Sequence, residues 1–383
     1  MNFPLDKFKQ IPTPFYYYDM ALLQDTLDEI KRCIAGFPFK VHYAVKANAN
    51  ATILEQIRRA GLGIDCVSGG ELAAAISAGF AGNEIAFAGV GKTDKEIAAG
   101  IDSDIFCFNV ESLPEMEVIN EIAASKGKVA RIAIRVNPNI DAHTHKYITT
   151  GLNENKFGIN VPQLDDVVDA ALAMQNVELI GLHFHIGSQI RETEPFIMLC
   201  EKANELLQHL EARGVKLSII NVGGGLGINY DMPENEPIPN FASVFAIIKQ
   251  HLKVGNREVH FEFGRSIIGQ CGELITKVLY NKTTATGRRL VIVDGSMTEL
   301  IRPALYGSYH NIENITSEAT QRTKYTIVGT ACESTDVFDE NVSLPITKRG
   351  DLLTIKSAGA YGMSMASRYN QHDLPAAVYS DEL

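Results

Sequence analysis

Chemically capable side chains recur at one kind of position, at the end of short apolar runs or directly after them. In chain order they are Lys46, Asp65, Arg135, His185, the consecutive glycines Gly223, Gly224 and Gly225, and Glu262. Taken singly, each has an ordinary explanation, such as a solvated lysine, a helix N-cap or a tight turn. Their repetition at equivalent positions indicates one shared site.

The chemistry of these side chains suits a phosphorylated ring cofactor. Backbone N–H groups of the glycine run can close around a phosphate, because no Cβ atoms intervene. Glu262 can face a protonated ring nitrogen, and Arg265 can bind a phosphate or a carboxylate. A desolvated Lys46 would have a lowered pKa and could form a Schiff base. Together these features predict pyridoxal 5′-phosphate as the cofactor.

Two His-x-His pairs, His143 with His145 and His183 with His185, offer a metal hydrolase as an alternative. A metal site would need further ligands on neighbouring strands, where this chain has Arg135 and the glycine run. We therefore expect no metal, and we interpret His183 as a packed residue of the barrel interior.

The elements that must position these residues alternate between strands and helices. Apolar runs indicating strands cover residues 41–45, 63–67, 84–88, 104–110, 131–136, 179–186, 217–222 and 258–263. Helical patterns cover residues 51–60, 70–78, 112–125, 162–174, 195–212 and 242–252. Eight strands with intervening helices predict an α/β fold, a (β/α)8 barrel whose active site lies at the C-terminal strand ends.

After residue 264 the pattern changes to short strands, at residues 274–280, 290–293, 324–328 and 351–356, with no convincing helix. We expect a second, mostly antiparallel β domain that also contains a strand at residues 15–18. The predicted domains are a cofactor-binding barrel at residues 26–270 and a β domain formed by residues 1–25 and 271–383.

The composition limits the class of protein. The chain has 383 residues, 45% of them hydrophobic, and 35 Lys and Arg against 46 Asp and Glu. The resulting net charge of −11 argues against a nucleic-acid partner. No apolar run approaches the roughly 20 residues that span a bilayer, and six widely spaced cysteines indicate free thiols. We expect a cytoplasmic enzyme without a membrane partner.

Several motifs, in order and nearly from end to end, resemble the fold-type III pyridoxal-phosphate decarboxylases. They are YAVKAN at residues 43–48, DCVSGGEL at 65–72, RVNP at 135–138, KFG at 156–158, HFHIGSQ at 183–189, RPALYG at 302–307, CES at 332–334 and GAYG at 359–362. The chain is most similar to the branch of this family that acts on meso-diaminopimelate.

The resemblance implies a role for each residue at the cofactor. Lys46 would carry the Schiff base, His185 would stack on the ring, and Glu262 would pair with the ring nitrogen. Alanine racemases have an arginine at that nitrogen, so the acid favours decarboxylation. The implied cofactor-binding residues are Lys46, Asp65, His185, Ser188, Gly223, Gly224, Gly225, Glu262, Gly264, Arg265 and Tyr361.

The resemblance also implies a proton donor and a substrate. Cys332 would protonate the carbon that loses CO₂, reaching the neighbouring subunit's site in a homodimer. The implied substrate-binding residues are Arg265, Arg302, Tyr306, Glu333 and Tyr361. The expected reaction is decarboxylation of meso-2,6-diaminopimelate to L-lysine, the last step of lysine biosynthesis, through Schiff-base and quinonoid chemistry.

Alternatives within the superfamily are decarboxylation of lysine, ornithine or a carboxylated polyamine. A non-catalytic pyridoxal-phosphate carrier is a further alternative, but such chains resemble the barrel alone. Two positions depart from the family pattern. Phe263 stands where proline is usual, and Ala377 stands where an acid is expected.

Overall fold

The computed structural model describes residues 3–140 and 156–383, so the predicted pair His143 and His145 lies outside the described residues. The chain divides into two compact units. The β unit comprises Met1–Thr26, Ile228–Pro239 and Arg265–Leu383. The barrel unit comprises Leu27–Gly227 and Asn240–Gly264. The segment Ile228–Pro239 therefore belongs to the β unit, although it lies within residues 26–270, the range predicted for the barrel domain.

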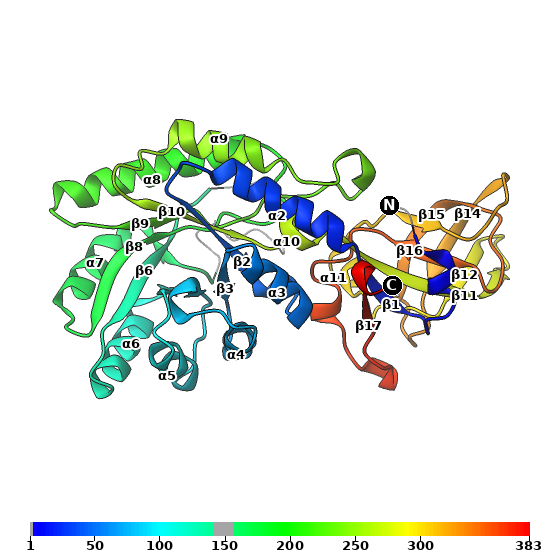
Figure 1. The fold of residues 1–383 in the computed structure, drawn as a ribbon, viewed down its shortest axis with the longest axis horizontal. Coiled ribbons are helices and arrows are strands. Elements are labelled where there is room, and N and C mark those ends of the chain that lie inside the picture. The colour runs from blue at the N-terminus through cyan, green and yellow to red at the C-terminus, as the bar shows by residue number, and fades with distance from the viewer. Residues whose placement is uncertain (1–2, 141–155) are drawn as a thin grey trace. The chain divides into compact units, whose positions relative to one another are not determined.

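The barrel unit contains a strand in each of the eight predicted runs. They are β2 (Phe39–Ala44), β3 (Gly63–Cys66), β4 (Ile85–Phe87), β5 (Cys107–Val110), β6 (Ala130–Asn137), β8 (Val177–His183), β9 (Ile219–Asn221) and β10 (Glu258–Phe263). All pair in parallel in the order β5-β4-β3-β2-β10-β9-β8-β6, and pairing of β5 with β6 closes the ring (Figure 1). The short β7 (Ile159–Asn160) adds to β6. The predicted eight-stranded barrel is confirmed.

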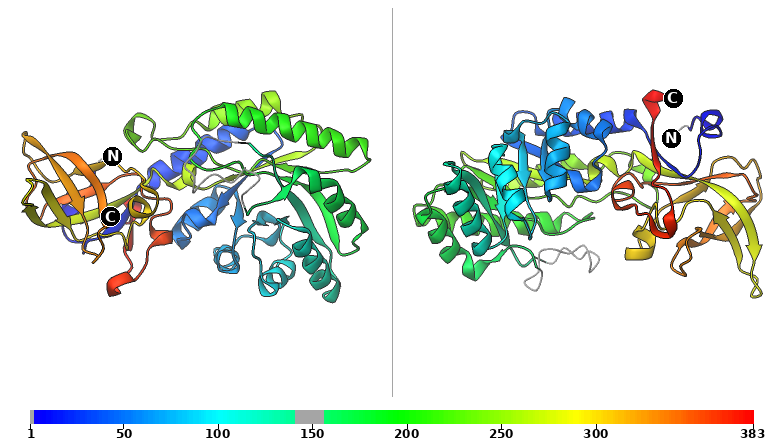
Figure 2. Two further views of the ribbon diagram at one scale, coloured as in Figure 1. Left: turned by 180° about the vertical axis from the view of Figure 1, so that it is seen from behind. Right: turned by 90° about the horizontal axis from the view of Figure 1, so that it is seen from below.

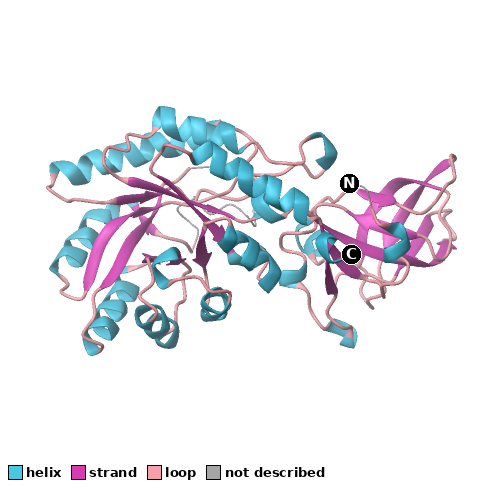
Figure 3. Ribbon diagram, viewed as in Figure 1, coloured by secondary structure: helices cyan, strands magenta, loops and turns pink. Residues whose placement is uncertain are grey.

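Helices lie outside these strands, as the secondary-structure colours of Figure 3 show. They are α3 (Ala51–Arg59), α4 (Gly69–Ser77), α5 (Asp94–Asp102), α6 (Leu113–Ser125), α7 (Leu164–Ala173), α8 (Glu194–Ala212) and α9 (Phe241–His251). Helices α8 and α9 pack side by side, which is visible from front and back (Figures 1 and 2). Helices α5 and α2 (Met20–Ile34) were not predicted from the sequence. No helix in the described part of the chain is long and apolar enough to cross a membrane.

The β unit contains a mixed sheet in which most pairs are antiparallel. Its strands are β1 (Phe15–Tyr18), β11 (Gly272–Thr283), β12 (Arg289–Val293), β13 (Ile312–Asn314), β14 (Arg322–Val328), β15 (Val337–Pro345), β16 (Leu352–Ile355) and β17 (Ala376–Tyr379). Among the described strand pairs of this sheet, only β1 with β17 and β12 with β14 are parallel. The predicted strands are present, whereas β13, β15 and β17 were missed because they are short or carry many polar residues.

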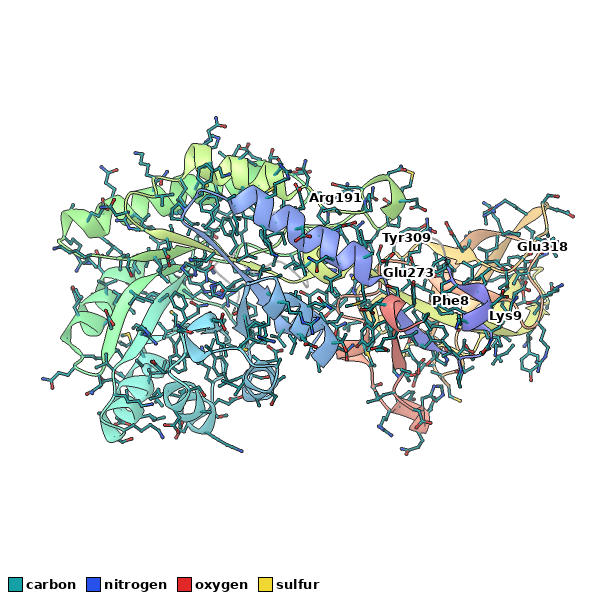
Figure 4. All side chains as sticks on the ribbon, in the orientation of Figure 1. Phe8, Lys9, Arg191, Glu273, Tyr309 and Glu318 are labelled. Carbon is teal, nitrogen blue, oxygen red and sulfur yellow. The ribbon has the colours of Figure 1, made fainter. Side chains whose placement is uncertain are left out.

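A cluster of apolar side chains stabilises the β unit. Phe8, Phe15, Tyr17, Ile275 and Leu352 are buried together, and Phe8 is labelled in Figure 4. Phe8 belongs to the short helix α1 (Leu5–Phe8). Two further short helices, α10 (Arg265–Ile268) and α11 (Arg302–Tyr306), correct the expectation that this part of the chain has no helix.

Candidate active site

The carboxylate of Glu262, on β10, lies inside the barrel unit and is held by three side chains. Its Oε1 atom accepts hydrogen bonds from Asn221 Nδ2 at 2.7 Å and Asn109 Nδ2 at 3.1 Å. Its Oε2 atom lies 3.1 Å from His183 Nε2. Glu262 is 7% exposed, and these partners come from β9, β5 and β8. An acid at the end of one strand is therefore oriented by the ends of three others.

This arrangement keeps Glu262 ionised. Burial alone would raise the pKa of its carboxyl group, but the interactions with neighbouring groups, first among them the electrostatic interaction and hydrogen bond with His183, together lower the pKa. The charge of Lys46 lowers it further. The predicted packing of His183 in the barrel interior is correct, and the structure adds its contact with Glu262. A buried carboxylate of this kind suits a partner that carries a proton on a nitrogen atom.

His185 does not close a strand as predicted, because β8 ends at His183. The Gly224 N–H donates to His185 Nδ1 at 3.4 Å and so restricts the orientation of the ring. Desolvation and the charges of Lys46 and Arg135 lower the pKa of His185 well below its ordinary value. The imidazole is therefore neutral, which suits an aromatic face for stacking.

The glycine run is required by close packing as well as by any ligand. A Cβ atom on Gly223 would lie 2.2 Å from the Phe184 carbonyl oxygen, and one on Gly224 would lie 1.9 Å from the Glu262 carbonyl oxygen. Gly223 and Gly225 also have φ angles of 69° and 103°. Gly223 meets both conditions, which only glycine tolerates. The Gly223 N–H donates to Asn221 Oδ1 at 2.9 Å, so this amide helps to fix the loop.

Lys46 lies in a single 3-10 turn, Val45–Ala47, directly after β2. Its charge acts on Asp65, His185 and Glu262, so the four predicted residues share one environment. The expectation that Lys46 is desolvated is wrong, since its side chain is exposed. Gly264 packs against this turn, because a Cβ atom there would lie 3.1 Å from the Ala47 Cβ.

Asp65, on β3, is a second buried acid, 2% exposed. Burial and the charge of Glu262 raise its pKa, whereas Lys46 opposes that rise. Its Oδ1 atom is buried and has no hydrogen-bond partner among the described residues. Ser188 follows His185 in the segment after β8 and is partly exposed.

Arg135, on β6, forms an ion pair that the sequence analysis missed. Its Nη1 atom lies 2.5 Å from Glu111 Oε1, and both side chains are buried. Glu111 Oε2 also accepts a hydrogen bond of 2.8 Å from the Gly158 N–H. In the described part of the chain, no group of three His, Cys, Asp or Glu side chains is placed to hold a metal ion.

The β unit contains a cluster built around two buried arginines. Arg265 Nη1 donates to Tyr230 Oη at 2.6 Å, and its Cζ lies 4.9 Å from the Tyr361 ring centre. Arg302 Nη1 lies 2.8 Å from His310 Nε2. Arg265 and Arg302 are 6% and 5% exposed. Two buried guanidinium groups in one cluster are suited to a carboxylate or phosphate ligand.

Tyr361 and Tyr306 belong to the same unit as this cluster. Tyr361 has a φ of 58°, in the left-handed region that non-glycine residues seldom occupy. Tyr306 ends α11 and is partly exposed. Tyr230 and His310 were not predicted, because irregular segments around them carry no periodic signal.

Cys332 and Glu333 lie on an exposed turn of the β unit. The Cys332 N–H donates to Asn370 Oδ1 at 2.9 Å, and Glu333 accepts a hydrogen bond from the Tyr369 hydroxyl. Cys332 is exposed, whereas the other five cysteines are buried, and all are free thiols. The thiol of Cys332 is therefore the accessible one in this chain.

The barrel-unit residues fit pyridoxal phosphate on their own chemistry. An ionised, buried Glu262 suits a ring nitrogen that carries a proton, and a neutral His185 suits the ring face. Asp65 Oδ1 is an acceptor still to be satisfied. The accessible amine of Lys46 suits the aldehyde of the cofactor.

Comparisons with known proteins agree with this fit. Residues 21–269 match the model of the pyridoxal-dependent decarboxylases, pyridoxal binding domain. The chain is 55% identical to the diaminopimelate decarboxylase of Bacteroides thetaiotaomicron, over 100% of this chain and 99% of that protein. It is 39% identical to the diaminopimelate decarboxylase of Aquifex aeolicus, over 96% of this chain and 86% of that protein.

Solved structures of two decarboxylases are similar to this chain. The crystal structure of Helicobacter pylori diaminopimelate decarboxylase complexed with L-lysine has a TM-score of 0.94 and 38% identity, covering 99% of this chain and 94% of that chain. A Chlorella virus arginine decarboxylase shares the fold, with a TM-score of 0.85 at 21% identity, covering 98% of each chain.

Proposed function

The chain belongs to the family of pyridoxal-dependent decarboxylases, and we propose that it converts meso-diaminopimelate to L-lysine and CO₂, the last step of lysine biosynthesis. The observation that carries the proposal is the ionised Glu262 held by Asn109, Asn221 and His183. Diaminopimelate decarboxylases that are 55% and 39% identical over nearly the whole chain support this choice of substrate.

The barrel-unit residues would prepare the cofactor for this reaction. When bound, pyridoxal phosphate supplies an electron sink for the electron pair left by the departing CO₂. Lys46 would hold the cofactor through its amine, and His185 would support the ring face. Glu262, being ionised, would hold a proton on the ring nitrogen. Asp65, Ser188, Gly264, Tyr361 and the glycine run are proposed to complete the cofactor site.

The arginine cluster supports a substrate with two carboxylates. Meso-diaminopimelate keeps one carboxylate after the reaction, and Arg265 with Arg302 would bind it. Tyr306 and Tyr361 would add donors, and Glu333 would bind the ammonium group beside that carboxylate. Ornithine and lysine have no second carboxylate, so two buried arginines favour diaminopimelate over them.

Cys332 is proposed as the acid that protonates the carbon from which CO₂ leaves. We propose a homodimer in which this thiol serves the neighbouring subunit's site, so that an isolated monomer would be inactive. A cytoplasmic location is likewise proposed, from the pathway to which the reaction belongs.

The substrate assignment is tested with the cofactor-loaded enzyme and a panel of four compounds: meso-diaminopimelate, L-lysine, L-ornithine and a carboxylated polyamine. CO₂ release is measured for each compound at equal concentration. The proposal predicts release from meso-diaminopimelate alone at a substantial rate. Equal release from ornithine would contradict the role given to Arg302.

A further inference from the structure

The two arginines of the β unit carry like charges and are both buried, which is unfavourable without compensation. Burial, and after it the charge of Arg265, lower the pKa of Arg302, although Tyr230 acts in the opposite direction. The two guanidinium groups therefore interact electrostatically. Something in the protein must keep them in one cluster when no carboxylate ligand is bound.

Tyr230 contacts both guanidinium groups. Its hydroxyl accepts the 2.6 Å hydrogen bond from Arg265 Nη1, and its ring centre lies 5.0 Å from Arg302 Cζ. Burial would raise the pKa of the Tyr230 phenol, but the two guanidinium charges lower it. A tyrosine offers an acceptor atom and a ring face without bringing a carboxylate into the cluster.

His310 adds a second contact to Arg302. Its Nε2 atom accepts from Arg302 Nη1 at 2.8 Å, and its Nδ1–H donates to the Lys356 carbonyl oxygen at 2.8 Å. Burial and the charge of Arg302 lower the pKa of His310 to about 3, so the ring is neutral at ordinary pH. Its ring meets Tyr230 edge to face, with centres 5.1 Å apart.

We propose that Tyr230, supported by His310, is a positioning residue that holds Arg265 and Arg302 ready for one carboxylate and thereby selects ligands that carry it. The two rings hold the cations in place without a carboxylate of their own, so the guanidinium groups remain available to the carboxylate of the ligand. An aspartate or glutamate at position 230 would compete with that carboxylate. This inference rests on the proposed function, since it concerns the carboxylate that the product retains.

The test compares two ligands that differ by this one carboxylate, L-lysine and 1,5-diaminopentane. Their dissociation constants are measured by calorimetry on the cofactor-loaded enzyme and on Tyr230→Phe, which loses only the hydroxyl. We expect Tyr230→Phe to weaken lysine binding about tenfold and to leave diaminopentane binding unchanged. Tyr309→Phe is the matched control, because Tyr309 is 45% exposed on the surface of the same unit (Figure 4) and should change neither.

Equal weakening of both ligands would mean that Tyr230 is merely structural, and no change in either would also overturn the inference. If Tyr230→Phe loses the cofactor absorbance, His310→Leu gives a second test, because it removes an acceptor of Arg302 and leaves Tyr230 in place. It should lower the preference for lysine about threefold, and an unchanged preference would overturn the inference. Absence of CO₂ release by the unaltered enzyme from meso-diaminopimelate would instead refute the proposed function.

Discussion

The barrel unit and the β unit hold their functional residues in different ways. In the barrel unit, Glu262 is fixed by hydrogen bonds from the ends of three other strands. In the β unit, Cys332 lies on an exposed turn, where its backbone N–H donates a hydrogen bond to Asn370 Oδ1. The barrel unit therefore supplies a preorganised electrostatic site. The β unit supplies the Cys332 thiol on an exposed turn, and the neighbours of this thiol depend on what the turn contacts.

Replacement of Lys46 by alanine should have the largest effect. The variant loses the amine that holds the cofactor, so both turnover and the absorbance band at roughly 420 nm should disappear. Absorbance and CO₂ release are measured together after addition of cofactor. Lys40→Ala is the control and should retain both, because Lys40 is an exposed lysine on strand β2, which precedes the turn of Lys46. A full band in Lys46→Ala would contradict the role of Lys46.

Replacement of Cys332 by alanine should distinguish the contribution of the β unit to catalysis from that of the barrel unit to cofactor binding. Loss of the general acid should lower turnover about 10²- to 10⁴-fold, while the absorbance band is retained because the barrel unit is unaltered. Cys33→Ala is the matched control. Cys33 is also a free cysteine, but it lies on helix α2 and has no proposed role in the reaction. Loss of the band in Cys332→Ala would show instead that this residue supports the fold.

Replacement of Asn109 by alanine should have a moderate effect confined to the barrel unit. It removes one donor to Glu262 Oε1 but leaves Asn221 and His183 in place. The pKa of Glu262 should then rise, and the acidic limb of the kcat/KM profile should move to higher pH, with about a tenfold loss of kcat. An unchanged acidic limb would show that this donor does not help to keep Glu262 ionised.

The smallest effect concerns a buried histidine pair of the barrel unit. His42 Nε2 lies 2.8 Å from His260 Nδ1, and burial lowers the pKa of both rings, that of His260 to about 2. Their pKa values are ordinary, about 6.5, in the unfolded chain. The folded state therefore binds fewer protons, and its stability is present above pH 6.5 or so and falls as the pH drops below it.

Chemical unfolding at pH 7.5 and 5.5 measures this loss. The free energy of unfolding should fall by about 1 kcal/mol for each histidine over this range. His260→Phe should show a smaller fall than the unaltered protein, whereas His209→Gln, at an exposed histidine of α8, should show the same fall. An equal fall in all three proteins would contradict the assignment to the buried pair.

The two units also differ in how much of them the sequence predicts. Lys46, Asp65 and Glu262 were found because parallel strands bring their C-terminal ends to one rim. Asn109 and Asn221 were missed, although each is a polar residue within an apolar strand run, and that contrast could have revealed them. Desolvation of Lys46 was wrongly expected, because burial depends on neighbours that are distant in the sequence.

In the β unit, local patterns gave less information. Arg302 and Cys332 were selected by motif resemblance. Arg302 lies in a five-residue helix and Cys332 on a turn, and neither element has an extended periodicity. Tyr230 contacts arginines that lie 35 and 72 positions further along the chain, and no local signal marks such a contact.

Phe263 is fully buried and stacks on Phe261 at 5.7 Å, so the departure from proline is accommodated by aromatic packing.

The most direct test of the central claim is identification of the product formed from meso-diaminopimelate by the cofactor-loaded enzyme. Chiral chromatography with mass spectrometry follows the amino acid, and released CO₂ is quantified in the same reaction. We predict L-lysine and CO₂ in equal amounts, and none with Lys46→Ala. Absence of L-lysine, in a preparation that shows the cofactor absorbance, would contradict the account.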